Sequence, residues 1–452
     1  MKKTILLLTL SFGSILANAQ SPAITSWLQN TTGIMGRHYV AGNSTPINDN
    51  VLANVQTVQY SASWVYVSTK GIPAYITGPF LDNNPSFASN QNAIFKISLN
   101  PVQNTGTPTN TTGGNIGIFI NGVALFDYRD GVSWNAATNA LAGGPLGGMG
   151  NNVWNRDAVV GERLGFDCAK AHPAMGNYHH HQNPSAFNLD LDVISNVCDL
   201  YASDGLYAID STQHSPLIGY AYDGFPIYGA YGYRDTTGTG EIVRMKSSYS
   251  LRNITSRTTN AAGATVTAGP DVSTTYPLGY FREDYQYNPT SASTPDYLDE
   301  HNGRYCKTPE YPGGTYCYFA TVDENWNSAY PYVVGPTFYG TKTAVKVTSI
   351  TETVQTYTPN VTQVEDVNAS NLNLLTYPNP ADDLLAIQWK SVNKQNSTIE
   401  LFDIQGKLIQ TTTMNQGSSV AYFDTRSLYD GEYIVRMALG NQFITKKIVI
   451  QH

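Results

Sequence analysis

Four of the eight histidines in this 452-residue chain lie within ten residues of one another. They are His172, His179, His180 and His181, in the stretch CAKAHPAMGNYHHHQNP. A neutral imidazole binds Zn, Cu, Fe or Ni ions through a ring nitrogen. Histidines at this density therefore indicate a transition-metal site, for which we consider Zn or Cu. The alternative is an architectural role, in which the histidines hydrogen-bond loops and pack against tyrosines.

The order of the histidines determines which of them can share an ion. If this stretch is extended, successive side chains point to opposite faces. His179 and His181 then share one face, with Cα atoms about 6–7 Å apart, so that both rings can reach one ion. Tyr178 and His180 share the other face. The candidates for a third ligand, which must come from elsewhere in the chain, are His172, Glu300 and His301.

Two acidic residues next to turns are candidates for acid–base catalysis. Asp223 lies in YDGFPIYG, and Glu300 lies in LDEHNG. Close carboxylates push each other's pKa values apart, as a general acid and a general base require. A carboxylate-based hydrolase using Asp223 and Glu300 is therefore a third and weaker possibility. In the alternative interpretation both residues serve their turns, and Asp223 accepts N–H groups of its own turn.

The first nineteen residues have the pattern of a signal peptide rather than of a folded element. Lys2 and Lys3 precede a short apolar run over residues 5–16, and Ala17-Asn18-Ala19 is a small-x-small cleavage site. We therefore expect export through the periplasm, with Gln20 as the mature N-terminus.

The composition favours many short strands. Charged residues make up 13% of the chain, about half the usual share, while it contains 39 Gly and 31 Tyr. We predict an all-β main domain, either a sandwich or barrel-like. The net charge of −8 argues against a nucleic-acid partner. No segment after the signal peptide reaches the about 18 apolar residues of a membrane span, so we predict no transmembrane segment.

The four cysteines predict two disulfide bonds, because an even number in an exported protein is typical of disulfides. Cys306 and Cys317 flank a Pro-Gly-Gly turn in CKTPEYPGGTYC, so they are positioned to close a hairpin. Cys168 would then pair with Cys198. A Cys/His zinc site is the alternative, but the chain has no CxxC spacing to support it.

The chain divides into segments of different composition. Residues 20–340 contain many aromatic residues and turn signals, including Asn121-Gly122 between two apolar runs, which predicts a type I′ hairpin. Residues 341–373 are rich in Thr, Val, Gln and Asn and are expected to be a linker. Residues 374–452 alternate apolar and polar residues between Gly-containing turns, which predicts a small β-sandwich.

This last segment resembles the type A sorting domain of the type IX secretion system of Bacteroidetes. The resemblance rests on Tyr377-Pro378-Asn379-Pro380, on ELFDIQGK, on DGEYIVRM and on the terminal KKIVI. It implies that the secretion machinery is a partner and that the protein reaches the cell surface or the medium. It also implies that the sorting domain is usually cleaved off.

The main domain resembles the YHYH family, which is named for a Tyr-His-Tyr-His run. The resemblance rests on GNYHHHQNP, LIGYAYDGFPIYGAYG, LDEHNGRYCKTPEYPGGTYCYF and YPYVVGPTFYG. His180 stands where the family has its second Tyr, on the face that does not carry His179 and His181. The resemblance implies a secreted bacterial protein and supplies no reaction.

Two main function classes follow from these patterns. The first is a secreted metal-binding protein centred on His179 and His181. The second is a surface protein whose Tyr-rich loops bind an extracellular polymer and whose histidines are architectural. The two differ in whether His172, His179, His181, Asp223 and His301 converge in a pocket.

Overall fold

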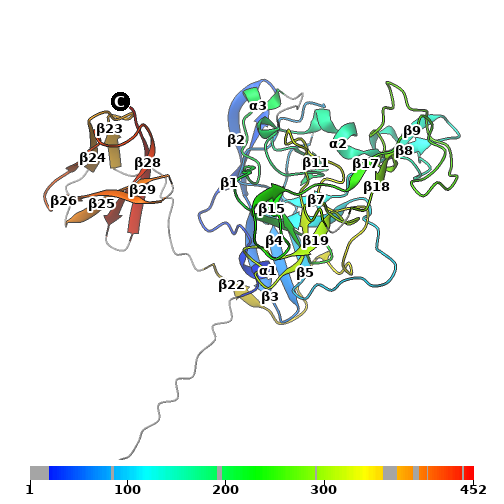
Figure 1. Ribbon diagram of the computed structural model, residues 1–452, viewed down its shortest axis with the longest axis horizontal. Coiled ribbons are helices and arrows are strands. Elements are labelled where there is room, and N and C mark those ends of the chain that lie inside the picture. The colour runs from blue at the N-terminus through cyan, green and yellow to red at the C-terminus, as the bar shows by residue number, and fades with distance from the viewer. Residues whose placement is uncertain are drawn as a thin grey trace, which may run out of the picture. The chain divides into compact units, whose positions relative to one another are not determined.

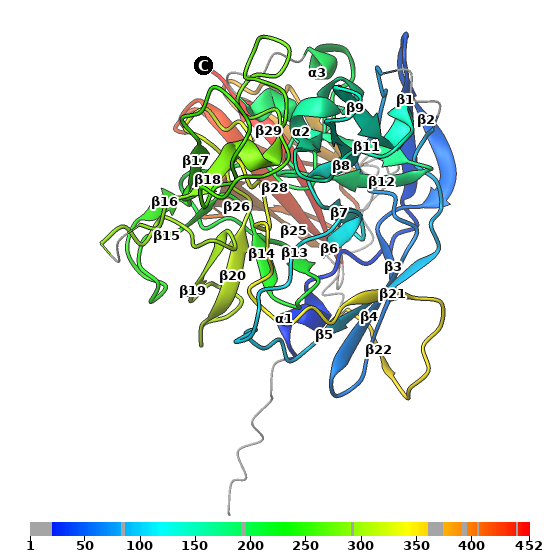
Figure 2. The same ribbon diagram turned by 90° about the vertical axis from the view of Figure 1, so that its right-hand side faces the viewer.

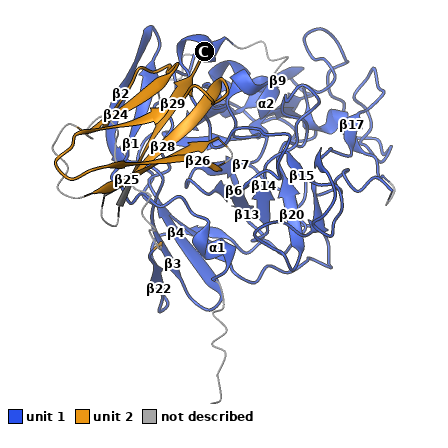
Figure 3. Cartoon of the chain, turned by 60° about the vertical axis from the view of Figure 1, so that its left-hand side comes forward, with its two compact units in different colours: residues 1–358 blue, residues 359–452 orange. Residues whose placement is uncertain are grey.

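The computed structural model describes residues 20–82, 86–190, 196–290, 293–359, 374–389, 396–404, 406–439 and 442–452. It divides the chain into two compact units, residues 1–358 and residues 359–452 (Figure 3). The predicted signal peptide over residues 1–19 lies outside the described residues, as do residues 360–373 of the predicted linker.

The first sheet of the main unit has five antiparallel strands. Its two outer strands come from the part of the chain that is predicted to be a linker. They pair with β3 and β5 and complete both edges of the sheet, so the main unit continues to Thr358. In order across the sheet, the strands are β21 (Val345–Val347), β5 (Ala93–Ser98), β4 (Trp64–Thr69), β3 (Val55–Tyr60) and β22 (Gln355–Tyr357).

The second sheet has eight strands and carries the histidine-rich stretch at one edge. Its strand pairs are antiparallel, except that β12 runs parallel to β7 and β14 runs parallel to β20. Figure 2 shows the strands side by side from β12 to β19. In order they are β11 (Ala171–Ala174), β12 (Asn177–His180), β7 (Ala124–Phe126), β6 (Asn115–Phe119), β13 (Leu217–Ala221), β14 (Pro226–Tyr228), β20 (Thr315–Phe319) and β19 (Gly303–Cys306).

The two sheets share one hydrophobic core. Val65 and Phe95 of the five-stranded sheet belong to the same buried cluster as Ile118 and Ile218 of the eight-stranded sheet. Two sheets that bury a common core form a sandwich. The all-β prediction is therefore confirmed. Among the described residues no sheet closes on itself, so the main unit takes the sandwich form and not the barrel-like one.

Many tyrosines are buried in this unit, and buried aspartates accept hydrogen bonds from their hydroxyl groups. Tyr178 donates to Asp167 over 2.8 Å, and Tyr332 donates to Asp157 over 2.9 Å. Burial raises the pKa of both aspartates to about 7. A buried hydroxyl without a partner is costly, so these pairs explain how the core accommodates buried tyrosine hydroxyl groups.

The other strands and the helices of the main unit lie outside these two sheets (Figure 1). The helices are single turns, and no helix among the described residues has the length and apolar character needed to cross a membrane. These elements are α1 (Pro22–Thr25), β1 (Met35–Val40), β2 (Asn43–Leu52), β8 (Arg129–Asn135), β9 (Ala140–Gly143), η1 (Gly144–Leu146), β10 (Asn155–Asp157), α2 (Ala158–Gly161), η2 (Arg163–Gly165), η3 (Phe187–Leu189), α3 (Val197–Leu200), β15 (Tyr231–Tyr233), β16 (Ile242–Arg244), β17 (Tyr249–Leu251), η4 (Arg282–Asp284) and β18 (Tyr285–Tyr287).

The hairpin predicted at Asn121-Gly122 forms between β6 and β7, but its turn differs from the type I′ turn. Gly122 has a φ of 82°, while Asn121 is not among the residues with positive φ. The Asn121 side chain instead accepts a hydrogen bond from the N–H of Val123. Four residues, not two, separate the strands, so the side chain of Asn121 stabilises a longer loop.

The C-terminal unit is a small β-sandwich, as the sequence predicts. Leu385 and Phe423 of its three-stranded sheet share a core with Leu401 and Val435 of its four-stranded sheet. The three-stranded sheet consists of β23 (Leu374–Tyr377), β24 (Leu384–Trp389) and β27 (Val420–Asp424). The four-stranded sheet consists of β26 (Leu408–Met414), β25 (Ser397–Asp403), β28 (Gly431–Leu439) and β29 (Gln442–Ile450).

One of the two predicted disulfide bonds forms. Cys168 is bonded to Cys198, whereas Cys306 and Cys317 are buried free thiols. Cys306 lies opposite Thr315, two residues from Cys317 along β20. Diagonal partners of this kind have Cα atoms about 7–8 Å apart, beyond the about 4.4–6.8 Å of a disulfide. The prediction of a bond between Cys306 and Cys317 is therefore wrong, because the strand register keeps the two residues too far apart.

Replacing Cys198 with serine is expected to lower the free energy of unfolding of the main unit by about 3 to 4 kcal/mol. The disulfide closes a loop with a sequence separation of 30, and its loss releases the entropy of that loop in the unfolded chain. Urea unfolding of wild type and Cys198→Ser measures the difference. As a control, reductant should destabilise wild type and leave Cys198→Ser unchanged. Equal stability of wild type with and without reductant would contradict the prediction.

Candidate metal centre

A two-residue hairpin brings three of the histidines together. β11 and β12 are antiparallel, and His172 lies directly opposite His179 in their register. Met175 and Gly176 form the turn, both with positive φ, as a two-residue type I′ hairpin requires. Directly opposite residues project from the same face of a sheet. His181, two residues beyond His179, projects from that face as well.

The three imidazole rings are in contact. Ring centroids are 4.7 Å apart for His172 and His179, 4.7 Å for His179 and His181, and 5.6 Å for His172 and His181. One ring nitrogen from each lies within 4.8 Å of the other two. All three side chains are buried. This is the spacing that three ligands of one ion have.

The hydrogen bonds of the outer ring nitrogens fix the tautomers. Nδ1 of His179 is 2.8 Å from the carbonyl oxygen of Asn177, and Nδ1 of His181 is 2.7 Å from that of Asp127. Because a carbonyl oxygen only accepts, both Nδ1 atoms carry the proton. The two Nε2 atoms face each other at 3.0 Å. In the neutral rings these would be two opposed lone pairs, an arrangement that a shared cation stabilises.

A carboxylate completes the cluster. Glu162 lies between α2 and η2, and its Oε2 atom is 3.2 Å from Nε2 of His172 and 3.2 Å from Nε2 of His181. Glu162 Oε2 and His172 Nε2 are nevertheless buried without a hydrogen-bond partner, since the approach has the distance of an ion pair but not the angles of a hydrogen bond. Three imidazole nitrogens and one carboxylate oxygen therefore converge on a common point.

The pKa values of His179 and His181 shift in opposite directions. Burial, together with His181 and His172, lowers the pKa of His179 well below its ordinary value. Burial also acts to lower the pKa of His181, but the adjacent Glu162 outweighs it, and that pKa is raised. Burial acts to raise the pKa of Glu162, but the two imidazoles beside it lower that pKa. The cluster thus keeps Glu162 ionised, favours the protonated form of His181 and disfavours the protonated form of His179.

Aromatic side chains hold the imidazole rings of the cluster in place. Phe126 of β7 stacks on His179 with centroids 3.8 Å apart. Phe166 packs edge-on against His172 at 5.1 Å and also lies 6.3 Å from His181. Outer-sphere hydrogen bonds and apolar walls of this kind are typical of metal-binding histidines.

His180 points away from the cluster. Its Nε2 atom is 2.7 Å from the hydroxyl of Tyr75, and its ring packs against Phe119 and Tyr178. Burial, with a further contribution from Lys170, lowers its pKa to about 3. His180 is therefore a neutral packing residue on the opposite face of β12.

A pocket of about 500 Å³ opens beside the cluster. Its lining includes both Glu162 and His172, so one side of the cluster can be reached from solvent. Leu164 and Met175, 82% and 97% exposed, stand at its wall. The other lining residues are Asp82, Pro145, Arg156, Gly161, Gly165, Pro173 and Ala174.

The remaining predicted ligands lie elsewhere. His301 is not a member of the cluster of His172, His179 and His181. Its Nδ1 atom is 2.8 Å from the hydroxyl of Thr337, and its ring packs against Tyr339. Glu300 has an exposed side chain, whose Oε1 atom is 3.8 Å from Nε2 of His301. The structure therefore gives His301 a structural role in its loop.

The predicted catalytic carboxylate Asp223 is fully buried. Its Oδ2 atom accepts hydrogen bonds from the hydroxyl of Tyr318 at 2.6 Å and the N–H of Gly340 at 2.8 Å. Its Oδ1 atom accepts from the N–H of Phe225, in its own turn. Burial raises the pKa of Asp223 to about 6. The Asp223 carboxylate is thus used in hydrogen bonds that stabilise the fold. Glu300 lies on an exposed turn and does not form an acid–base pair with it.

Glu162 is the cluster residue that the sequence did not identify. It precedes His172 by ten residues and reaches the histidines only because the chain turns at α2 and η2. The weak signal for it is the charged pair Glu162-Arg163 in the otherwise apolar stretch AVVGERLGF.

Two family models match the chain. One, described as YHYH protein, matches residues 94–331, which include every member of the cluster. The other, described as a secretion system C-terminal sorting domain, matches residues 375–451. No curated protein matches the chain. The sorting domain indicates export to the cell surface or the medium.

Proposed function

The chain belongs to the YHYH protein family, and from this premise we propose that it is an exported metal-binding protein. It holds one transition-metal ion, Zn or Cu, on His172, His179 and His181. The YHYH match spans the ligands, and the sorting domain accounts for export. Type IX secretion machinery is the partner that carries it out of the cell.

The observation that carries this proposal is the pair of facing Nε2 atoms. Those of His179 and His181 are 3.0 Å apart, while each Nδ1 atom donates to a carbonyl oxygen. Nε2 of His172 and Oε2 of Glu162, both buried without a hydrogen-bond partner, adjoin them. Buried polar atoms normally have hydrogen-bond partners, and one cation binds all four of these atoms.

The donor set suits the proposed ions. Zn is most often four-coordinate with nitrogen, sulfur and oxygen ligands, and imidazole also suits Cu. The three histidines supply the nitrogens. Glu162 supplies an oxygen on the side of the pocket, where a small molecule from solvent can approach the ion or replace the carboxylate.

The rival function is the surface polymer-binding protein with architectural histidines. In that account a proton, and not a metal, lies between His179 and His181. His180 is an architectural histidine of this kind, since it bonds to Tyr75 in the core. The two accounts differ in the uptake of metal.

Metal affinity is expected to fall as the pH falls. Each ligand must be deprotonated, so protons compete with the ion. Because Glu162 raises the pKa of His181 above its ordinary value of 6.5, this competition begins above that pH. Equilibrium dialysis of the metal-free mature protein against Zn between pH 8 and pH 5 measures the effect. We expect one bound ion per chain at pH 8 and release on acidification.

The matched control for this titration is His214→Ala, since His214 is a partly buried histidine of the same unit that lies outside the cluster. Its titration curve should overlay that of wild type. Absence of uptake at pH 8 would favour the polymer-binding account. Uptake that does not depend on pH would contradict ligation by the histidines.

A further inference from the structure

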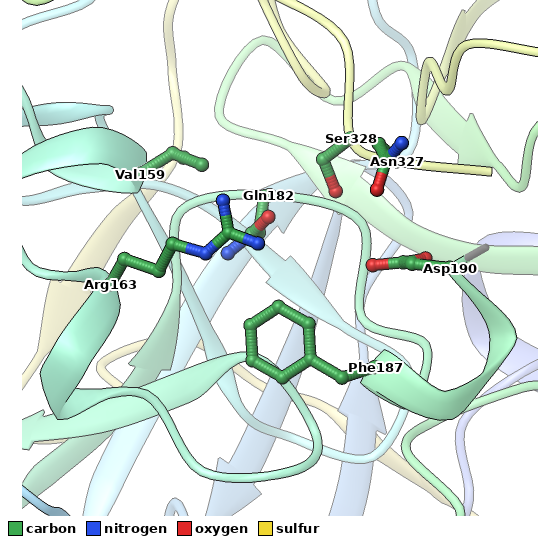
Figure 4. A pocket seen from close by; sticks show the side chains of 7 residues that line it. All are labelled: Val159, Arg163, Gln182, Phe187, Asp190, Asn327 and Ser328. Carbon is green, nitrogen blue, oxygen red and sulfur yellow. The ribbon is translucent and has the colours of Figure 1, made fainter. Parts of the chain in front are cut away.

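A second pocket shares no lining residue with the first. It has a volume of about 240 Å³. Arg163, which follows Glu162, and Gln182, which follows His181, both line it. Figure 4 shows Arg163 on one side of the pocket, Asp190 on the other and the ring of Phe187 between them.

Three polar groups in this pocket lack partners. Among the described residues, the guanidinium of Arg163, which is an exposed residue, makes no hydrogen bond and no ion pair. It lies 6.0 Å from the Phe187 ring and acts on Asp190 through its charge. The amide of Gln182, a residue only 2% exposed, has no hydrogen-bond partner in the described part of the chain. The hydroxyl of Ser328 is buried and also unpartnered. Buried polar groups normally have hydrogen-bond partners, so the buried Gln182 amide and Ser328 hydroxyl point to a ligand in this cavity.

The charges around the pocket indicate the sign of that ligand. Asp190 is neutralised by the buried Lys170, whose Nζ atom lies 3.2 Å from both of its carboxylate oxygens. Asp323, which acts on Asp190 through its charge, is bound within its own turn by Asn325 and Asn327. Arg163 is therefore the charged side chain of this pocket that forms no ion pair. Its N–H groups are free to donate hydrogen bonds to a ligand.

We propose that this pocket binds a small organic carboxylate, held by Arg163, Gln182 and Ser328. A guanidinium and a carboxylate match in a bidentate, charge-assisted arrangement. The Gln182 amide and the Ser328 hydroxyl supply further donors, and the Phe187 ring offers an apolar surface for the carbon skeleton. This proposal is independent of the metal ion, because none of the three groups is a member of the histidine cluster.

Titration of the full mature protein with three sodium carboxylates of increasing size tests the proposal. The probes are acetate, L-lactate and D-glucuronate, with sodium chloride and D-glucose as the matched ion and the matched neutral sugar. Isothermal titration or saturation-transfer NMR should detect one site for at least one carboxylate. Arg163→Met should weaken that binding by about tenfold or more, since hydrogen bonds between charged groups are the strong ones.

Arg234→Met is the matched control, because it removes an exposed arginine of the same unit that is paired with Glu241. It should bind the carboxylate as wild type does. Metal content should be equal in all three proteins, which separates this pocket from the histidine cluster. The proposal is overturned if wild type binds none of the three carboxylates, or if Arg163→Met binds them as tightly as wild type does.

Discussion

Protein carrying His179→Ala is expected to be purified without stoichiometric metal, whereas wild type takes up one ion per chain. His179 lies at the centre of the cluster, since its ring is 4.7 Å from that of His172 and 4.7 Å from that of His181. Changing an outer-sphere partner of a metal ligand costs about 10- to 100-fold in affinity. Loss of a ligand should cost at least about 100-fold.

Elemental analysis and competition with a chelator measure this change. Two matched controls carry the same substitution at other buried histidines. His180→Ala removes the adjacent residue, which faces Tyr75 on the opposite side of β12. His301→Ala removes a histidine that the sequence suggests as a ligand but that lies outside the cluster. Both should retain the ion. If His180→Ala loses metal as His179→Ala does, the ligand assignment is wrong.

Deletion of residues 374–452 is expected to retain the protein in the periplasm. The deleted segment covers the match to the sorting domain, and its strands form a sandwich with a core of their own. The main unit does not depend on that core and should remain folded. Immunoblots of periplasm, cell surface and medium measure the distribution.

Two controls accompany the deletion. Attachment of a sorting domain from another exported protein should restore export, and the disulfide between Cys168 and Cys198 should still form in the retained protein. An unchanged amount of truncated protein in the medium would show that the segment does not direct export.

The local patterns of the sequence anticipated much of the fold. Alternating apolar residues and turn glycines predicted two β units, and the alternation over Tyr178 to His181 placed His179 and His181 on one face of a strand. These predictions succeed because side-chain direction in a strand depends on the neighbouring residues alone.

Features that depend on contacts distant in the sequence were not predictable in the same way. Glu162 reaches His172 and His181 from a loop with no periodic pattern. The register of β19 and β20 places Cys306 diagonally to Cys317, and a shift of two residues would have brought them opposite each other. Strand register and loop position are set by packing of the whole domain, which local patterns do not encode.

The most direct test of the metal proposal is anomalous diffraction from crystals of the mature protein equilibrated with Zn, measured at the Zn absorption edge. We predict one strong peak per chain, about 2.0–2.1 Å from Nε2 of His172, His179 and His181. The facing Nε2 atoms, now 3.0 Å apart, should separate around the ion. An absence of anomalous density at the cluster, with the two Nε2 atoms still in contact, would contradict the assignment of a metal centre.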